Sequence, residues 1–249
     1  MSDSRRRAYQ LGGVLLCTVV VVIVIVAVLS SSSPAPLVPG RPVPGEHTVI
    51  SSLQGIPQSG IALGSERAPV TLVEFGDLQC PYCAIFAKQV LPRIVSRFVR
   101  QGRVRILFRN LDGLGKDSVR AAQMAAALGK QNRLWQFVEL AYRNQGDENS
   151  GYVTDDFLRA ISQVIPGVDV GLALRELHSS AVSAQIAQAM SLAHQFKLKV
   201  TPSFLLFKTG ATPRTFTPSS LESGAFIAPL EKLVASVGGT EATRIQARS

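Results

Sequence analysis

The sequence predicts an α/β domain in which a strand–helix–strand unit is interrupted by a run of helices, with one transmembrane helix before it. Three observations support this fold class. A strand pattern at Val70–Phe75 leads directly into a Cys-Pro-Tyr-Cys motif and a helical pattern. About ninety residues between Asn110 and Thr201 show helical patterns only. An uncharged segment from Leu11 to Leu29 is long enough to cross a bilayer.

The N-terminal segment Leu11–Leu29 is mostly Val, Leu and Ile. Its nineteen residues at about 1.5 Å each span roughly 28 Å, close to the hydrocarbon core of a bilayer. Arg5, Arg6 and Arg7 precede it, so the positive-inside rule predicts a cytoplasmic N-terminus over residues 1–10 and an extracytoplasmic remainder. A cleaved signal peptide is the alternative, but its apolar region usually runs only about 7–15 residues. We therefore expect an uncleaved, single-pass signal-anchor in the cell membrane.

The part after this segment is expected to form a stalk, one folded domain and a tail. Residues 30–64 contain six prolines with Gly and Ser between them, a composition that favours polyproline-like extension without a core. Residues 65–238 are enough for one domain with a buried core. Residues 239–249 lack periodicity and are predicted to be a flexible tail.

The folded part begins with a strand–helix–strand pattern. Val70–Phe75 places alternate residues on opposite faces of a strand. After Cys83, apolar residues recur about every four positions, as in an amphipathic helix. Pro92 lies within this helix and must kink it or begin a second segment, because its ring removes one backbone hydrogen bond. Gly102 ends the helix, and residues 104–109 alternate as a second strand.

A helical insertion is predicted over about residues 111–198. Residues 121–128 are strong helix formers, and an apolar stripe continues through residues 134–141. Three further helices are predicted at 154–164, with Thr154 as N-cap, at 168–178 and at 181–196. Lys199–Phe207 then resumes a strand pattern, and Pro202 stands at its start, where a missing backbone donor is tolerated. A final helix precedes the tail.

Cys80 and Cys83 are the candidate reactive residues. Two cysteines three positions apart at a helix N-terminus lie within one turn, so they can close a disulfide or open to a dithiol. Unpaired N–H groups and the positive end of the helix dipole stabilise a thiolate at Cys80. A lowered pKa makes Cys80 the nucleophile, and Cys83 can then resolve the mixed disulfide. The motif therefore predicts thiol–disulfide exchange.

A structural disulfide and a metal site are the alternatives at this motif. A bridge that closes so short a loop gives little entropic stabilisation, and a structural zinc site needs four ligands. The remaining cysteine, Cys17, lies inside the apolar segment, and His47, His178 and His194 form no metal-binding motif. We therefore expect no metal ion, and no cofactor other than the redox-active cysteine pair.

The basic composition does not point to nucleic acid. The net charge is +9, but the basic residues are spread out and are not interleaved with aromatic residues for base stacking, so nucleic-acid binding is not expected. A solvated basic surface is the simpler interpretation, and it suits an anionic membrane face or acidic client proteins.

Four segments, in order, resemble the DsbA-like branch of the thioredoxin superfamily. They are residues 73–83 with the cysteine pair, Ile106–Asn110, Leu134–Phe137 and Val200–Phe204. The resemblance covers about residues 67–237. It implies a thioredoxin fold with an inserted all-helical domain and the activity of a protein thiol:disulfide oxidoreductase.

The resemblance also implies roles for individual residues. The Thr201–Pro202 bond is expected to be cis and to face the cysteine pair, so that the backbone of Thr201 pairs with the extended chain of a client protein. Glu74 matches a family acid beneath the active site. Buried there, it would relay a proton to or from Cys83 with a raised pKa; alternatively, it reaches solvent at the strand end.

Pro81 and Tyr82 would set the surroundings of the thiolate and hence the redox potential. The chain departs from the family pattern at Val200, where Gly is common, and at residues 208–213, which replace a common Asn-Gly hairpin. These departures leave the register of the last strands open. The Pro-rich stalk does not match the dimerisation domain of dimeric isomerases, so a monomer is expected.

The expected function is that of a membrane-anchored, extracytoplasmic oxidase that donates disulfides to exported proteins with cysteine pairs. A membrane partner of the DsbB or VKOR type would reoxidise it. A reductase or isomerase would use the same pair in the other direction, and a redox-inactive client-binding module would not need it. The stability of the Cys80 thiolate decides between oxidase and reductase.

Overall fold

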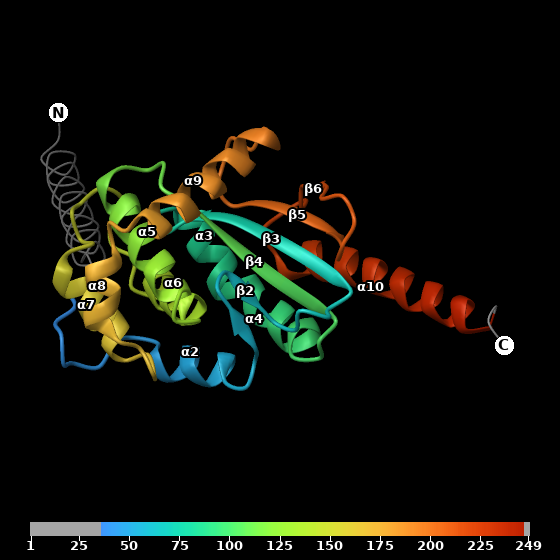
Figure 1. The fold of residues 1–249 in the computed structure, drawn as a ribbon, viewed down its shortest axis with the longest axis horizontal. Helices are drawn as coiled ribbons and strands as arrows, with labels where there is room; N and C mark the ends of the chain where they lie inside the picture. The colour runs from blue at the N-terminus through green and yellow to red at the C-terminus, as the bar shows by residue number, and fades with distance from the viewer. Residues whose placement is uncertain (1–35, 247–249) are drawn as a thin grey trace, which may run out of the picture. The chain divides into compact units, whose positions relative to one another are not determined.

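The computed structural model describes residues 36–246, so the predicted cytoplasmic N-terminus and membrane anchor lie outside the described residues. The centre of the described part is a six-stranded sheet in the order β1-β2-β4-β3-β5-β6. β3 (Val70–Asp77) and β4 (Val104–Leu111) run parallel, and every other neighbouring pair is antiparallel. Helices surround this sheet in Figure 1. The predicted α/β class is confirmed.

Strand β3 is buried on both faces because helices cover both sides of the sheet. All eight of its residues are buried. Val70 and Leu72 belong to the main core, which includes the helix that follows the cysteines. Val73 and Phe75 belong to a smaller core with Ala193 of α9 (Ser180–Gln195). The predicted alternation is therefore confirmed, and no residue of this strand faces solvent.

One helix of nineteen residues, Pro81 to Val99, follows Cys80 and is divided by two π-turns. Its segments are α3 (Pro81–Ile85), the π-turn η1 (Phe86–Val90), α4 (Leu91–Ile94) and the π-turn η2 (Val95–Val99). Pro92 stands in the first turn of α4, where the preceding π-turn accommodates a residue without an N–H group. Of the two predicted outcomes at this proline, the start of a second segment is confirmed.

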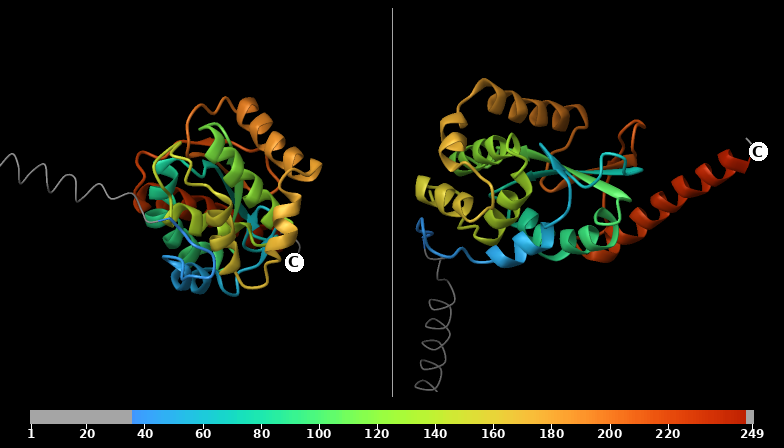
Figure 2. Two further views of the ribbon diagram at one scale, coloured as in Figure 1. Left: turned by 90° about the vertical axis from the view of Figure 1, so that its left-hand side faces the viewer. Right: turned by 60° about the horizontal axis from the view of Figure 1, so that its bottom comes forward.

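The predicted insertion contains five helices, and α9 is the last. The others are α5 (Lys116–Gly129), α6 (Leu134–Arg143), α7 (Asp155–Gln163) and α8 (Val170–Glu176). The Thr154 hydroxyl accepts from the backbone N–H of Phe157 at 3.1 Å, which confirms the predicted N-cap. Figure 1 shows α5 to α8 gathered at one end of the sheet, whereas α9 packs against β4. α9 also contacts α5, and the right-hand view of Figure 2 shows α9 alongside the sheet.

The stalk predicted over residues 30–64 is wrong for much of its described part. Helix α2 (Glu46–Leu53) and the short strands β1 (Gln58–Ser59) and β2 (Ala62–Leu63) occupy it, and β2 extends the sheet by pairing with β4. Val49, Leu53 and Leu63 are buried in the main core. Five of the six prolines precede Glu46, so the proline content of the whole segment conceals a later part that carries core residues.

The C-terminal part forms the edge of the sheet opposite β1. β5 (Ser203–Lys208) pairs with β3, and β6 (Thr215–Phe216) pairs with β5, which defines the register that the sequence left open. Helix α10 (Ser223–Gln246) continues past residue 238, so the predicted flexible tail over 239–249 is wrong as far as Gln246. No proline interrupts residues 239–246, and most of them tolerate a helix. Within residues 36–246, no helix is long and apolar enough to cross a membrane.

Candidate active site at the Cys80–Cys83 pair

The two cysteines lie where β3 gives way to helix α3. Cys80 is the N-cap residue of α3, and its backbone N–H donates to the Asp77 carbonyl at 3.0 Å. Pro81 follows in the first turn, a position where its missing N–H costs nothing. Cys80 is 5% exposed, whereas Cys83, one turn deeper, has no exposed surface. This confirms the predicted strand-to-helix placement, and only the first sulfur can be reached by a partner.

The surroundings of Cys80 favour its thiolate. The pKa of Cys80 is lowered from 9.0 to about 6, chiefly by a hydrogen bond from the Cys83 thiol. The Thr201 side chain and the backbone at Tyr82 and Cys83 lower the pKa further, whereas burial opposes the shift. Three pKa units correspond to about 4 kcal/mol in favour of the charged form. Cys80 is therefore mainly a thiolate at neutral pH.

Cys83 has the opposite character. Its pKa lies well above 9.0, first because it is buried and then because it donates to Cys80 and lies near Glu74. A thiolate at Cys83 therefore needs help to form, and once formed it readily takes up a proton. This asymmetry fits the predicted division of roles between a nucleophile at Cys80 and a resolving thiol at Cys83.

Glu74 is a buried acid in the middle of the sheet. Only 1% of its surface is exposed, and its Oε1 atom has no hydrogen-bond partner in the described part of the chain. Burial raises its pKa well above 4.5, and the nearby Glu139 carboxylate and Cys80 thiolate raise it further. Of the two predicted alternatives for Glu74, the buried carboxyl group is confirmed, and solvent contact at the strand end is excluded.

The loop before β5 completes the site. The Thr201–Pro202 bond is cis, and the Cys80 thiol lies 3.3 Å from the Thr201 carbonyl, to which it donates when it is protonated. The predicted cis bond facing the cysteines is thus confirmed. Val200 is 71% exposed and Tyr82 is 60% exposed, so large apolar side chains project into solvent beside both halves of the site.

Comparisons with known proteins agree with this geometry. Residues 57–215 match the family described as thioredoxin. The probable disulfide bond formation protein D of Bacillus cereus is 33% identical over 155 residues, which are 61% of this chain and 72% of that protein. The chain belongs to the DsbA-like thiol:disulfide oxidoreductases. The disulfide bond formation protein D of Bacillus subtilis is 29% identical over 154 residues, 61% of this chain and 68% of that protein.

A solved structure shares the DsbA-like fold. Oxidised BdbD from Bacillus subtilis superimposes with a TM-score of 0.62 and 24% identity, covering 80% of this chain and 99% of that one. The predicted thioredoxin fold with a helical insertion is therefore confirmed for the described residues. The enzyme class also excludes the redox-inactive binding module that the sequence left open.

A buried polar network holds the loop before Cys80 of this DsbA-like enzyme. The Asp77 carboxylate accepts from the Gln79 N–H at 2.9 Å and from the Ser118 hydroxyl at 2.6 Å. The Gln79 amide donates to the Leu114 carbonyl at 2.9 Å and accepts from the Asn149 N–H at 2.7 Å. The inserted helices and their loops thus position the active-site loop. The sequence did not predict this network. Its only local sign was the pair of polar residues Asp77 and Gln79 before the cysteines, and their partners Ser118 and Asn149 lie far away in the sequence.

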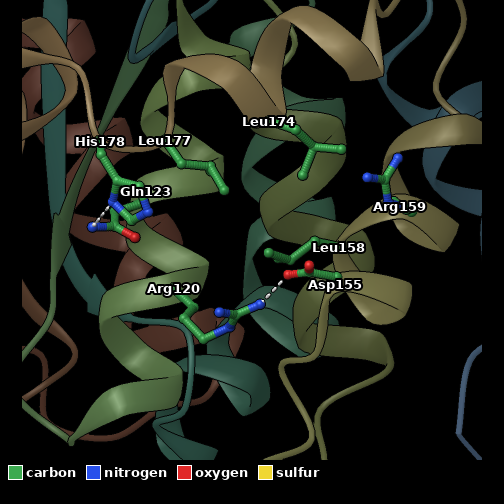
Figure 3. A pocket seen from close by; sticks show the side chains of 8 residues that line it. All are labelled: Arg120, Gln123, Asp155, Leu158, Arg159, Leu174, Leu177 and His178. Carbon is green, nitrogen blue, oxygen red and sulfur yellow. Dashed lines mark hydrogen bonds and ion pairs between the residues drawn. The ribbon is translucent and has the colours of Figure 1, made fainter.

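One cavity in the described part of the DsbA-like enzyme lies away from the cysteines. It has a volume of about 350 Å³ and lies among α5, α7 and α8 (Figure 3). Arg120 pairs with Asp155 there, and Gln123 lies within hydrogen-bond distance of His178 at 3.3 Å. His178, which follows α8, therefore has a hydrogen-bond partner in Gln123. Nowhere in residues 36–246 do three His, Cys, Asp or Glu side chains gather as a metal site would require.

Proposed function

We propose that this DsbA-like enzyme is an extracytoplasmic oxidase that donates disulfides to exported proteins. The lowered pKa of Cys80 carries the proposal. A stable thiolate favours the reduced dithiol form, and an enzyme whose reduced form is stable gives its disulfide away. At pH 7, a pKa of 6 instead of 9 favours the dithiol by about 1.4 kcal/mol, which makes the pair about 30 mV more oxidising.

The exchange proceeds in two steps. A client thiolate attacks the Cys80 sulfur, the Cys80–Cys83 bond breaks, and Cys83 leaves as a thiolate that takes a proton from Glu74. A second thiolate of the same client then attacks the client sulfur that is bonded to Cys80. A disulfide forms within the client, and Cys80 is released as a thiolate. The client loses two electrons and the enzyme gains them. Because Cys80 is stable as a thiolate, it is a good leaving group in the second step.

The exposed edge beside the cysteines suits an extended client chain. The Thr201 backbone lies within 3.3 Å of the reactive sulfur, so a strand bonded to this backbone would bring its own cysteine to Cys80. Tyr82 and Val200 offer apolar contacts on either side. Pro81 and Tyr82 stand between the cysteines and shape the surroundings of the thiolate.

The proposal includes the cellular setting. The uncharged segment Leu11–Leu29, preceded by three arginines, would anchor a monomer in the membrane with its catalytic domain outside. A quinone-linked membrane protein of the DsbB or VKOR type would reoxidise the cysteine pair. The named activity of the Bacillus relatives, disulfide bond formation, supports an oxidising role.

The test uses the oxidised full chain and a reduced peptide with two cysteines. We expect one peptide disulfide per enzyme molecule. In the Cys83→Ser variant with glutathione first bound to Cys80 as a mixed disulfide, a peptide with one cysteine should displace glutathione and stay bonded to Cys80. Cys80→Ser should abolish both, whereas Cys17→Ser, which removes the remaining cysteine, should change neither. If the reduced enzyme instead reduces peptide disulfides as readily as thioredoxin does, the enzyme is a reductase and the oxidase proposal is wrong.

A further inference from the structure

A cavity that does not include the cysteines is lined by a buried acid, Glu139. The cavity has a volume of about 170 Å³ and lies between α2, α6 and the helix segments α4 and η2, which Figure 1 shows below the sheet. Its lining residues are Ser52, Leu53, Leu91, Pro92, Val95, Ser96, Arg100 and Glu139. Ser96 and Arg100 are exposed and form its rim. Glu139 is the only carboxyl group in the lining.

Glu139 is poorly satisfied for a buried acid. It is 4% exposed, and its Oε1 atom has no hydrogen-bond partner in the described part of the chain. Its Oε2 atom lies 3.9 Å from the Arg143 guanidinium, too far for a good hydrogen bond. Burial raises the pKa of Glu139 to about 8, although Arg143 and Lys88 oppose the shift. The group therefore changes its charge near pH 8, at the wall of a cavity that water can enter.

The same face of α6 reaches the active site. Tyr142 lies three residues after Glu139, so the two side chains are neighbours on the helix. The Tyr142 hydroxyl donates to the Asp77 carbonyl at 3.2 Å. A Cβ atom at Gly76 would stand 2.8 Å from the Tyr142 hydroxyl and 3.3 Å from Glu74 Oε1. Tyr142 of α6 and Glu74 of β3 therefore both lie beside Gly76.

The two buried acids are also linked through their charges. A negative charge on Glu139 raises the pKa of Glu74, and burial of Glu74 is the larger cause of the same shift. The charged groups that face Glu139 are Arg143 on its own helix, Lys88 on η1 and Glu74 on β3, with Arg100 at the rim of the cavity. Glu74 itself is fully buried, so a proton that it takes from Cys83 needs a route to solvent.

We propose that Glu139 and its cavity are the route by which Glu74 exchanges its proton with solvent. The inference rests on the proposed proton transfer between Glu74 and Cys83. When a mixed disulfide is resolved, the Cys83 thiol gives its proton to the Glu74 carboxylate, and the Cys83 sulfur attacks Cys80 and expels the bound thiolate. Glu74 then passes the proton to the Glu139 carboxylate, which releases it to water in the cavity. Reduction of the enzyme reverses each transfer.

The test measures how fast the glutathione mixed disulfide at Cys80 resolves between pH 5 and 9, in the full chain with Cys17→Ser. Glu139→Gln keeps the shape of the side chain but cannot carry the proton, so resolution at pH 7 should slow by about tenfold or more. Adding acetate, a small acid that fits the cavity, should restore the rate in this variant and leave the parent unchanged. Glu139→Asp should keep most of the parent rate.

A second variant tests the cavity with Glu139 intact. Ser96→Phe places a large side chain at the rim and should also slow resolution, without rescue by acetate. Parent-like resolution in both Glu139→Gln and Ser96→Phe overturns the proposal, as does slow resolution of Glu139→Gln that acetate does not restore.

Failure of the underlying proposal is recognised separately. If Glu74→Gln resolves the mixed disulfide at the parent rate, the proton transfer between Glu74 and Cys83 is wrong. If the Cys80 pKa of the parent is not lowered, the proposed oxidase function is wrong.

Discussion

Replacing Cys83 should weaken the activation of Cys80 more than any other single change beside it. The hydrogen bond from the Cys83 thiol is the largest cause of the lowered Cys80 pKa. Cys83→Ala removes this donor but keeps the backbone of the first helical turn, the Thr201 side chain and the burial of the sulfur. The Cys80 pKa of this variant therefore isolates the contribution of the second cysteine.

The size of the effect can be bounded. The whole shift, from 9.0 to about 6, is worth about 4 kcal/mol. A hydrogen bond to a charged group contributes about 1.5–3 kcal/mol, which corresponds to about one to two pKa units. We therefore expect a Cys80 pKa of about 7 to 8 in Cys83→Ala. At pH 7 the thiolate fraction would fall from about nine-tenths to half or less.

The assay is a pH titration of thiolate absorbance at 240 nm, supported by the pH dependence of alkylation by iodoacetamide. All variants carry Cys17→Ser, so that Cys80 is the only cysteine that remains. Cys83→Ser is the matched control, because its hydroxyl still donates to the sulfur and should hold the pKa nearer to 6. An unchanged pKa of about 6 in Cys83→Ala would refute this reasoning and assign the activation to the helix terminus and Thr201.

Three further predictions concern the buried polar residues and the N-terminal helix. Glu74 stays protonated in the folded protein above the pH at which it ionises in the unfolded chain, so its burial lowers stability as the pH rises above about 4. Glu74→Gln should therefore resist urea better than the wild type at pH 8, but equally at pH 3. Gln79→Ala leaves buried partners unpaired and should lower the free energy of unfolding by about 1–3 kcal/mol; unchanged urea unfolding would show that the network does not support the loop. Leu53→Ala should cost about 2–5 kcal/mol because Leu53 is 3% exposed, whereas an extended stalk predicts no change.

Local patterns predicted most of the described fold. The alternation at Val70–Phe75, the cysteine motif and the Thr154 cap each depend on neighbours in sequence, and the structure confirms all three. The stalk prediction failed because it averaged composition over a segment whose later part contains buried residues such as Val49 and Leu53. Composition describes a whole segment, but burial depends on where its apolar residues stand.

The parts of the site that the sequence could not predict depend on contacts between distant segments. Gln79 is held by Asn149, seventy residues later, and neither residue carries a pattern that indicates the other. Glu139 and Glu74 come from a helix of the insertion and from the central strand. Periodicity predicts that α6 has a buried face, but only the packing of the insertion brings an acid on this face near enough to raise the pKa of the acid beneath the cysteines.

The reduction potential of the Cys80–Cys83 pair tests the central claim most directly. The measurement equilibrates the full chain with glutathione at pH 7 and follows the fraction of oxidised enzyme. An oxidase with a stabilised Cys80 thiolate should have a potential nearer to about −120 mV, the value of DsbA, than to about −270 mV, the value of thioredoxin. A potential at or below about −270 mV would contradict the oxidising role and show that the pair is poised to reduce its clients.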